Sequence, residues 1–289
     1  MTGLNADAYT HLIELALSED IGSGDVTSLS VVPCDTLWSA RVVCRQSVVV
    51  AGLKVATEVF RRVDARLEVV SDARDGDSAQ RGDTLLRVTG KARSILSGER
   101  VALNFVQRLC GIATLTRAFV DELKGLSCKI LDTRKTTPGW RLLEKHAVVC
   151  GGATNHRVGL FDMAMIKDNH LAVLTGGMKD RVKTAVSRVR EQYPDLRVEV
   201  EADTVEQVAD AVDAGADVVL LDNMSVEMLR QSVAIVGGRA LTEASGGITL
   251  GTLRLIAETG VDYVSVGALT HSAPAADIAL DIDGLMGDE

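Results

Sequence analysis

The spacing of apolar residues changes after a helical stretch that ends near residue 109. Near the start, apolar residues from Tyr9 to Ala16 recur at helical spacing, which predicts a first helix. Apolar or alternating runs follow, separated by Gly/Asp turns, and they predict strands at Ala40–Cys44, Ser47–Val50, Leu67–Val70 and Thr84–Val88. The stretch Ser94–Leu109 has helical spacing again, so we expect this part to mix helices with strands.

Six short apolar runs occupy the rest of the chain, and each is followed by a polar or glycine-rich turn and a helical pattern. They are Lys129–Leu131, Ala164–Ile166, Val198–Val200, Val218–Leu221, Ala240–Thr242 and Tyr263–Val266. The last four runs begin 20 to 23 residues apart, which is room for a strand, a helix and two loops. The pattern therefore predicts a repeated βα architecture.

Two architectures fit this repeat: an open doubly wound sheet and a closed or nearly closed α/β barrel. The runs are apolar throughout, as in strands that are covered on both faces. Chemically reactive residues also follow every run, which indicates that the strand ends converge on one place. Both observations favour a closed or nearly closed barrel over the open sheet, although six such units do not make the usual eight.

Basic residues follow the first two runs. Arg134 and Lys135 come after the first, Lys167 after the second, and His156-Arg157 lie in a glycine-rich loop between them. In parallel α/β folds the ligand site lies beyond the carboxyl ends of the strands, so these side chains are expected at one mouth. Arginine grips carboxylates or phosphates with two parallel hydrogen bonds. Because several cations repel one another, the site is expected to bind more than one negative group.

Acidic and glycine-rich residues follow the later runs. Glu201 and Asp222 suit hydrogen bonds to sugar hydroxyls or the binding of Mg²⁺. Ser245-Gly246-Gly247 and Val266-Gly267 follow the last two strands, where barrels often bind phosphate through backbone N–H groups. Each of these features alone is typical of an ordinary turn or a solvated surface. Their joint position at consecutive strand ends favours a functional site.

The composition is that of an ordinary globular protein, with 289 residues, 46% apolar and 25% charged. A net charge of −9 argues against a nucleic-acid or membrane-surface binder. The five cysteines show no CxxC spacing, so a disulfide framework or a zinc site is not expected. We find no signal-peptide pattern and no apolar stretch long enough to span a bilayer, and we expect a cytoplasmic protein.

Nine stretches strongly resemble the carboxylating nicotinate-nucleotide diphosphorylase family, also called the quinolinate phosphoribosyltransferases. They are EDIGSGDVTS, SGERVALNFVQRLCGIATLTR, ILDTRKTTPG, GGATNHRVGLFD, MIKDNH, VEVEAD, VLLDNMS, EASGGIT and TGVDYVSVGALTHSAPAADIAL. They cover nearly the whole chain in family order. Trp140 and Ala153 depart from the family pattern, but neither is a charged site position.

The resemblance implies an N-terminal α/β sandwich domain over residues 1–112, completed by residues 274–289, and an incomplete α/β barrel of about six strands with the active site over residues 113–273. It also implies a homodimer. The implied reaction transfers the phosphoribosyl group of phosphoribosyl diphosphate to quinolinate with decarboxylation. The products are nicotinate mononucleotide, diphosphate and CO₂, a step in NAD synthesis that uses Mg²⁺.

The resemblance also implies a role for each site residue. The catalytic residues are Lys135, Lys167, Glu201 and Asp222. Quinolinate is bound by Arg134, His156, Arg157 and Lys167, and by Arg100 from the partner subunit. Phosphoribosyl diphosphate is bound by Thr133, Lys135, Glu201, Asp222, Ser245, Gly246, Gly247, Val266 and Gly267. Glu201 and Asp222 hold Mg²⁺ directly or through water.

Two alternatives stay open. The first is a related phosphoribosyltransferase with another anionic acceptor, as in molybdenum-transport operons, against which the stretches Lys167–His170 and Leu221–Asn223 speak. The second is a non-catalytic anion-binding barrel, which we would expect to have lost at least one of the catalytic residues. None of them is lost.

Overall fold

A computed structural model describes residues 6–285, and the chain divides into two compact units. Within the described residues, the first unit comprises residues 6–117, 136–152 and 269–285, and the second comprises residues 118–135 and 153–268. The division that the sequence led us to expect after residue 112 falls inside helix α4 (Ala92–Glu122), which continues beyond it.

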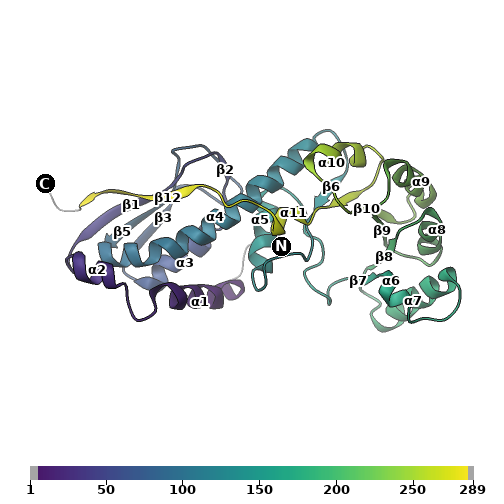
Figure 1. The fold of residues 1–289 in the computed structure, drawn as a ribbon, viewed down its shortest axis with the longest axis horizontal. Coiled ribbons are helices and arrows are strands. Elements are labelled where there is room, and N and C mark those ends of the chain that lie inside the picture. The colour runs from purple at the N-terminus through teal and green to yellow at the C-terminus, as the bar shows by residue number, and fades with distance from the viewer. Residues whose placement is uncertain (1–5, 286–289) are drawn as a thin grey trace. The chain divides into compact units, whose positions relative to one another are not determined.

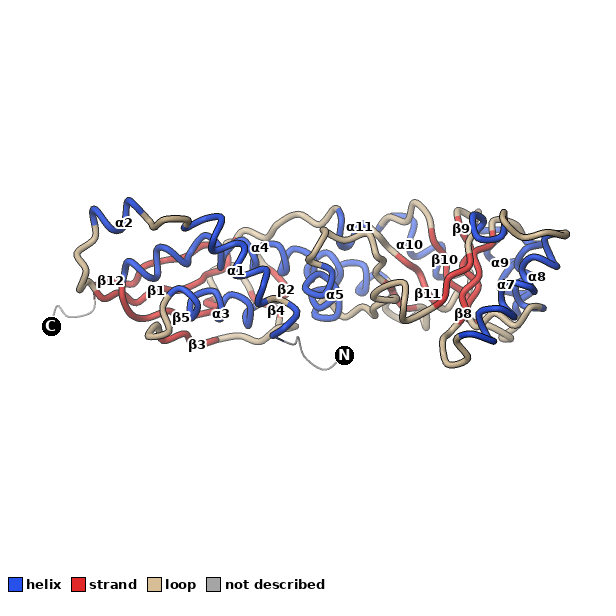
Figure 2. The backbone as a smooth tube through the Cα atoms, turned by 90° about the horizontal axis from the view of Figure 1, so that it is seen from below, coloured by secondary structure: helices blue, strands red, loops and turns tan. Residues whose placement is uncertain are grey.

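The first unit contains a four-stranded antiparallel sheet in the order β12-β1-β5-β3. Its strands are β1 (Leu37–Cys44), β3 (Glu68–Ser71), β5 (Thr84–Lys91) and β12 (Ile278–Leu285). β12 pairs with β1 along most of its length, for example Leu280 with Val42, so the last described strand completes the N-terminal sheet. Figures 1 and 2 both show α3 (Leu53–Val63) and α4 running alongside this sheet.

The remaining elements of this unit are short. They are η1 (Ala6–Ala8), α1 (Thr10–Ile21), α2 (Val26–Val31), β2 (Val48–Val49), β4 (Ser78–Ala79), α5 (Arg141–Cys150) and α11 (Ala268–His271). Local chemistry explains the start of α2, because Asp25 caps it by accepting a hydrogen bond from the backbone N of Ser28 at 2.9 Å.

The second unit contains a six-stranded parallel sheet, and all six predicted strands are present. They are β6 (Lys129–Leu131), β7 (Ala164–Ile166), β8 (Val198–Ala202), β9 (Val218–Asp222), β10 (Leu241–Ser245) and β11 (Tyr263–Ser265). The helices between them are α6 (Asp168–Leu171), α7 (Met178–Gln192), α8 (Val205–Asp213), α9 (Val226–Val236) and α10 (Leu250–Ala257). Figure 1 shows α8, α9 and α10 on the outer side of the strands.

The strand order β6-β11-β10-β9-β8-β7 distinguishes the two architectures that the sequence left open. From β7 to β11 neighbouring strands follow one another along the chain, and β11 pairs with β6, so the order is that of a ring. A doubly wound sheet instead reverses its order at an interior strand. Among the described residues β6 and β7 do not pair with each other, and Leu131 at the outer edge of β6 bridges Thr154 instead. The expected incomplete α/β barrel is therefore confirmed.

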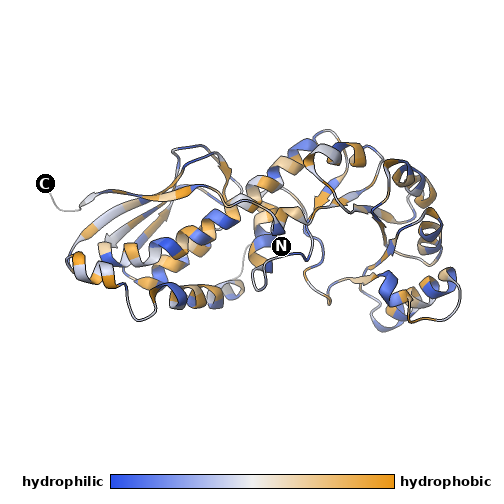
Figure 3. Ribbon diagram, viewed as in Figure 1, coloured by the Kyte–Doolittle hydropathy of each residue, from blue (hydrophilic) through white to orange (hydrophobic). Residues whose placement is uncertain are grey.

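The strands of the barrel are buried almost throughout, and the helices cover them. Val198, Val200 and the run Val218–Leu221 are each at most 5% exposed. Outer helices need only one apolar stripe, and α7 buries just Val182 and Val186 and is largely hydrophilic in Figure 3. Burial on both faces makes Glu199, which is 0% exposed within β8, a conspicuous exception.

No helix within residues 6–285 is both long enough and apolar enough to cross a membrane.

Candidate active site

The predicted site residues after β6 to β11 all belong to the barrel unit, where parallel strands present their carboxyl ends at one mouth. The strand register supports this placement. Ser245 at the end of β10 pairs with Asp222 at the end of β9, and Ala202 of β8 pairs with Leu221. Asp222 and Ser245 therefore lie at the same level on neighbouring strands.

Lys167 and Glu201 form an ion pair across the ends of β7 and β8. Lys167 also caps α6, where its backbone N donates to Nδ1 of His170 at 2.9 Å. The side chain of Lys167 is 41% exposed and that of Glu201 is 13% exposed. Lys167 is thus less buried than its position after an apolar run led us to expect, and it has an anionic partner from within the chain.

Three carboxylates gather at this mouth. One oxygen each from Glu201, Asp203 and Asp222 lies within 4.8 Å of the others. Asn223 fixes Asp222 by donating from Nδ2 to Oδ2 at 2.7 Å. Hard cations such as Mg²⁺ prefer carboxylate and water oxygens, so the cluster fits a magnesium ion. The sequence had indicated Glu201 and Asp222 but not Asp203.

Two guanidinium groups define the cationic side of the barrel. Burial lowers the pKa of Arg157, and the nearby positive charge of Arg134 lowers it further. Nη1 of Arg157 donates to the backbone O of Met163 at 3.1 Å, which holds the side chain in place. Because these two positive charges repel each other, they favour a ligand that carries negative groups.

The turn after β10 is closely packed against the turn after β9. The backbone N of Asn223 donates to the O of Ser245 at 2.9 Å, and Asn223 itself has a left-handed φ of 53°. A Cβ on Gly246 would lie 2.1 Å from Oδ1 of Asn223, so only glycine fits there. The Ser245-Gly246-Gly247 turn thus exposes backbone without side chains, as phosphate contact requires.

The other expected donor-site residues contribute backbone geometry. The backbone N of Val266 donates to the O of Leu131 at 2.9 Å, and its side chain is buried, so Val266 shapes the turn that leads to Gly267. Oγ1 of Thr133 accepts a hydrogen bond from the backbone N of Lys135 at 3.0 Å, which orders the loop after β6. Lys135 is exposed on that loop.

His156 lies in a buried cluster of carboxylates. Its Nε2 is 3.3 Å from Oε2 of Glu199 and 3.3 Å from Oε2 of Glu243. Burial alone would lower the pKa of His156, but hydrogen bonds and the charges of the two glutamates outweigh it and raise the pKa to about 10. Burial raises the pKa of Glu199. The backbone N of His156 donates to Oδ1 of a third buried carboxylate, Asp132, at 2.7 Å.

Sequence reasoning did not assign site roles to Asp132, Glu199 and Glu243. A signal was available for both glutamates: Glu199 is a charged residue within the apolar run Val198–Val200, and Glu243 directly follows the run Ala240–Thr242. Asp132 directly follows β6 and resembles any strand-end polar residue. Its burial depends on the loop at residues 153–156, which no periodicity predicts.

Arg100 belongs to the other unit. It lies on α4 between Glu99 and the buried Val101, and its side chain is exposed. The expectation that it serves the partner subunit's site therefore stays a prediction.

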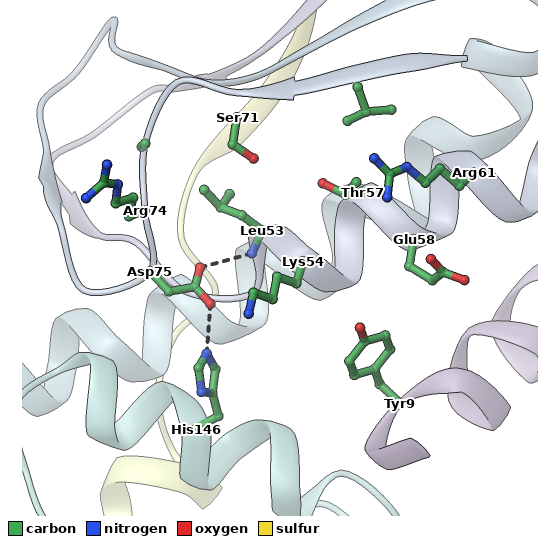
Figure 4. A pocket seen from close by; sticks show the side chains of 12 residues that line it. Tyr9, Leu53, Lys54, Thr57, Glu58, Arg61, Ser71, Arg74, Asp75 and His146 are labelled. Atoms are coloured by element: carbon green, nitrogen blue, oxygen red, sulfur yellow. Dashed lines mark hydrogen bonds and ion pairs between the residues drawn. The ribbon is translucent and has the colours of Figure 1, made fainter. Parts of the chain in front are cut away.

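A second polar cluster, also in the first unit, resembles a catalytic arrangement but does not have its geometry. Figure 4 shows Asp75 between His146 and the start of α3: its Oδ1 accepts from the backbone N of Leu53 at 3.1 Å, and its Oδ2 lies 2.7 Å from Nε2 of His146. Sγ of Cys150 contacts the same Nε2 at 3.5 Å. A nucleophilic triad would use both ring nitrogens. Burial raises the pKa of the Cys150 thiol to about 12, which keeps it protonated and a poor nucleophile at neutral pH. The role of this cluster is therefore to tie α5 to the loop before β4.

The structure is thus that of an α/β-barrel protein in which cationic groups, carboxylates and a glycine turn share one unit, an arrangement that suits small anionic ligands. Residues 25–110 match the N-terminal domain of quinolinate phosphoribosyl transferase, and residues 112–281 match the C-terminal domain. The chain therefore belongs to the quinolinate phosphoribosyl transferase family.

Individual relatives agree with this assignment. The chain is 44% identical over 288 residues to the chloroplastic nicotinate-nucleotide pyrophosphorylase (carboxylating) of Oryza sativa subsp. japonica, covering 94% of this chain and 77% of that protein. It is 42% identical to quinolinate phosphoribosyltransferase (decarboxylating) 1b of Nicotiana tabacum, covering 94% of this chain and 81% of that protein. The solved structure of the nicotinate-nucleotide pyrophosphorylase from Francisella tularensis superimposes with a TM-score of 0.91 at 36% identity, covering 97% of this chain and 98% of that one.

Proposed function

We propose that this chain catalyses the reaction of its family, the transfer of the phosphoribosyl group of phosphoribosyl diphosphate to quinolinate with loss of CO₂. The products are nicotinate mononucleotide and diphosphate. The observation that carries the proposal is the Lys167–Glu201 ion pair, because it joins the cationic and the acidic sides of the site at one barrel mouth. An enzyme that couples a dianionic acceptor to a sugar donor needs both sides next to each other.

The acceptor side is cationic. Quinolinate carries two adjacent carboxylates, and Arg134, Arg157 and Lys167 supply positive groups for them. His156 precedes Arg157 and belongs to the same side. In the dimer that we propose, Arg100 of the partner subunit adds a further cation. Four positive groups for one small ring favour a dicarboxylate over a monocarboxylate.

The donor side is acidic and glycine-rich. Glu201 and Asp222 would hold Mg²⁺, directly or through water, and they also suit hydrogen bonds to the ribose hydroxyls; a metal ion bound there would supply positive charge near the leaving diphosphate. Thr133, Lys135, the Ser245-Gly246-Gly247 turn and the Val266-Gly267 turn surround the phosphates. Replacing Asp222 with Ala should weaken binding of the donor with Mg²⁺ in calorimetry and leave quinolinate affinity unchanged. Lost quinolinate affinity with normal donor affinity would reverse this assignment.

The chemistry requires positioning and electrostatic stabilisation more than a protein nucleophile. The pyridine nitrogen attacks C1 of the ribose while the bond from C1 to the diphosphate oxygen breaks, and positive charge develops on the sugar. The ring nitrogen becomes cationic and stabilises the electron pair that the breaking bond to the 2-carboxylate leaves on C2 of the ring. CO₂ leaves, and a proton replaces it on the ring. The cationic acceptor side holds the ring still through both steps.

A comparison of acceptors tests the proposal. Purified protein with phosphoribosyl diphosphate and Mg²⁺ should convert quinolinate, and nicotinate, which lacks one carboxylate, should have a kcat/KM at least about a hundredfold lower. Arg157→Lys should raise the KM for quinolinate, because lysine cannot make two parallel hydrogen bonds to a carboxylate. A protein that uses nicotinate as well as quinolinate would refute the proposal. The site of action, which we expect to be the cytoplasm, stays a prediction.

A further inference from the structure

The buried carboxylates within the barrel have no part in the reaction as described above. Glu199 on β8 is 0% exposed and Glu243 on β10 is 2% exposed, while most buried strand positions of the barrel are apolar. Both line a cavity of about 140 Å³ that His156 and Arg157 also line. Burying two carboxylates is costly, so a fold that only had to be stable would fill these positions with apolar residues.

His156 connects these carboxylates to the acceptor side. Its Nε2 faces both glutamates at 3.3 Å, and its Nδ1 accepts a hydrogen bond from the backbone N of Arg157 at 2.7 Å. The carboxylates favour a second ring proton, but a proton on Nδ1 would face the N–H of Arg157. Two donors cannot meet at 2.7 Å, so this contact opposes the second ring proton that the raised pKa of His156 favours, and as long as Nδ1 accepts from Arg157 the ring carries its proton on Nε2.

Arg157 is therefore held at two points. The ring of His156 holds its backbone N, and the backbone O of Met163 holds its Nη1. Both nitrogens of His156 face groups of this chain, so the ring supports Arg157. The orientation of the ring in turn depends on Glu199 and Glu243, because these two groups face the Nε2 proton.

We propose that Glu199 and Glu243 are positioning residues that set the acceptor specificity of the site by holding His156, and through it Arg157, in the orientation that grips a quinolinate carboxylate. The inference rests on the proposed function. Neither glutamate touches a substrate. They act as the outer groups of a chain of contacts that runs from β8 and β10 to the guanidinium of Arg157.

The kinetic constants of a Glu243→Gln variant test this chain of contacts, which we call the relay. The amide keeps the shape of the side chain but removes the charge that orients the Nε2 proton. The KM for quinolinate should rise about tenfold while the KM for phosphoribosyl diphosphate stays within about twofold, because only the acceptor grip is displaced. Equal changes in both constants, or a lower kcat with both KM values unchanged, would show a general loss of structure and overturn the proposal.

A double-mutant cycle distinguishes the relay from an independent effect. If Glu243 acts through His156, adding Glu243→Gln to a His156→Asn protein should change the quinolinate KM by less than about twofold. If the double variant instead raises the quinolinate KM by the product of the two single effects, Glu243 does not act through His156. Wild-type turnover of quinolinate is the reference: its absence would refute the proposed function, whereas an active wild type with an unaltered Glu243→Gln variant would refute only the relay.

A matched control comes from the other unit. Glu144 is also 0% exposed and pairs with Arg108 at 3.0 Å, and we assign it no role in the site. Glu144→Gln should lower the melting temperature without raising the quinolinate KM. Should Glu243→Gln fail to fold, Glu199→Gln gives the same test, because it also leaves His156 with one carboxylate. If both variants fail to fold while Glu144→Gln folds, the glutamates are stability elements and the proposal is wrong.

Discussion

At the scale of single residues, several carboxylates outside the barrel stabilise the ends of elements. Asp64 follows α3 and accepts hydrogen bonds from Nε of Arg66 at 2.8 Å, the backbone N of Arg66 at 3.1 Å and Oγ of Ser94 at 2.9 Å. The side-chain bond from Arg66 contributes most to holding the pKa of Asp64 well below its ordinary value. A folded-state pKa below the unfolded one stabilises the fold above the unfolded pKa, and this stabilisation is lost as the pH falls.

Asp64→Asn should therefore lower the free energy of unfolding at pH 7 by about 1 kcal/mol, because the amide offers one acceptor fewer and no charge. The difference from wild type should shrink steadily below about pH 4, as the wild-type carboxyl becomes protonated. Urea unfolding at several pH values measures it. Asp20→Asn on the exposed face of α1 is the control and should be neutral throughout. A cost for Asp64→Asn that is constant down to pH 3 would contradict this account.

The charged residues of the barrel show what sequence reasoning at this scale reaches and what it misses. The positions of Lys167, Glu201 and Asp222 were predictable, because a charged residue directly after an apolar run marks a strand end. Glu199 was not assigned, since periodicity alone treats a charge within an apolar run as an interruption. Glu243 follows the run Ala240–Thr242, and its burial within β10 is visible only in the structure. Their role depends on a histidine that is more than 40 residues away from each of them in the sequence.

At the scale of elements, α4 shows how tertiary contacts override local signals. The sequence predicted a helix that ends near Leu109, the last apolar position of its pattern, but the helix continues to Glu122. Gly111 lies within the helix, and a Cβ there would lie 2.0 Å from the backbone O of Pro274. The segment that passes this glycine is tied to α4, since the backbone N of Ala276 donates to the O of Gln107 at 2.9 Å. The glycine permits this close approach and does not end the helix.

Gly111→Ala should therefore destabilise the protein by roughly 2 kcal/mol, although alanine favours a helix by about 1 kcal/mol. The matched control is Gly98→Ala on the same helix. Its Cβ would lie 3.0 Å from Cδ1 of Phe60, a side chain that can move, so we expect a change within about 1 kcal/mol in either direction. Thermal unfolding of both variants measures the difference. Equal stability of the two variants would mean that the approach of Pro274 is not tight.

The strands were easier to predict than the helices of the first unit. The six barrel strands are confirmed because apolar, β-branched runs between turns have few other solutions. Helices α2 and α3 were not predicted. The six-residue α2 depends on its Asp25 cap, and α3 depends on an apolar face that packs only once the four-stranded sheet exists.

At the scale of the whole molecule, the sequence gives the number of βα units but not their order. Periodicity cannot distinguish a cyclic strand order from one that reverses, because both use the same strands and helices. Only the pairing of β6 with β11, between residues that are more than 130 positions apart, identifies a barrel that is open between β6 and β7. The resemblance to a family led to the same architecture from sequence alone.

The proposed dimer makes a prediction at this scale, because it places Arg100 in the partner subunit's acceptor site. Arg100→Ala and Lys167→Ala proteins should each be inactive. When their subunits exchange, a mixed dimer has one site with both defects and one site with neither. Random exchange makes half of the dimers mixed, so about a quarter of the wild-type sites should return. If Arg100 acts within its own chain, every site keeps a defect, and no recovery after proven exchange would refute the shared site.

The most direct test of the whole account follows the carboxylate that leaves. Purified protein is incubated with quinolinate labelled in its 2-carboxylate, with phosphoribosyl diphosphate and Mg²⁺. The account predicts labelled CO₂, diphosphate and nicotinate mononucleotide in equal amounts, and no CO₂ when the donor is omitted, because the ring nitrogen becomes cationic, and can stabilise the electron pair left on C2, only after it has bonded to the ribose. Diphosphate release without CO₂, or CO₂ release without the donor, would contradict it.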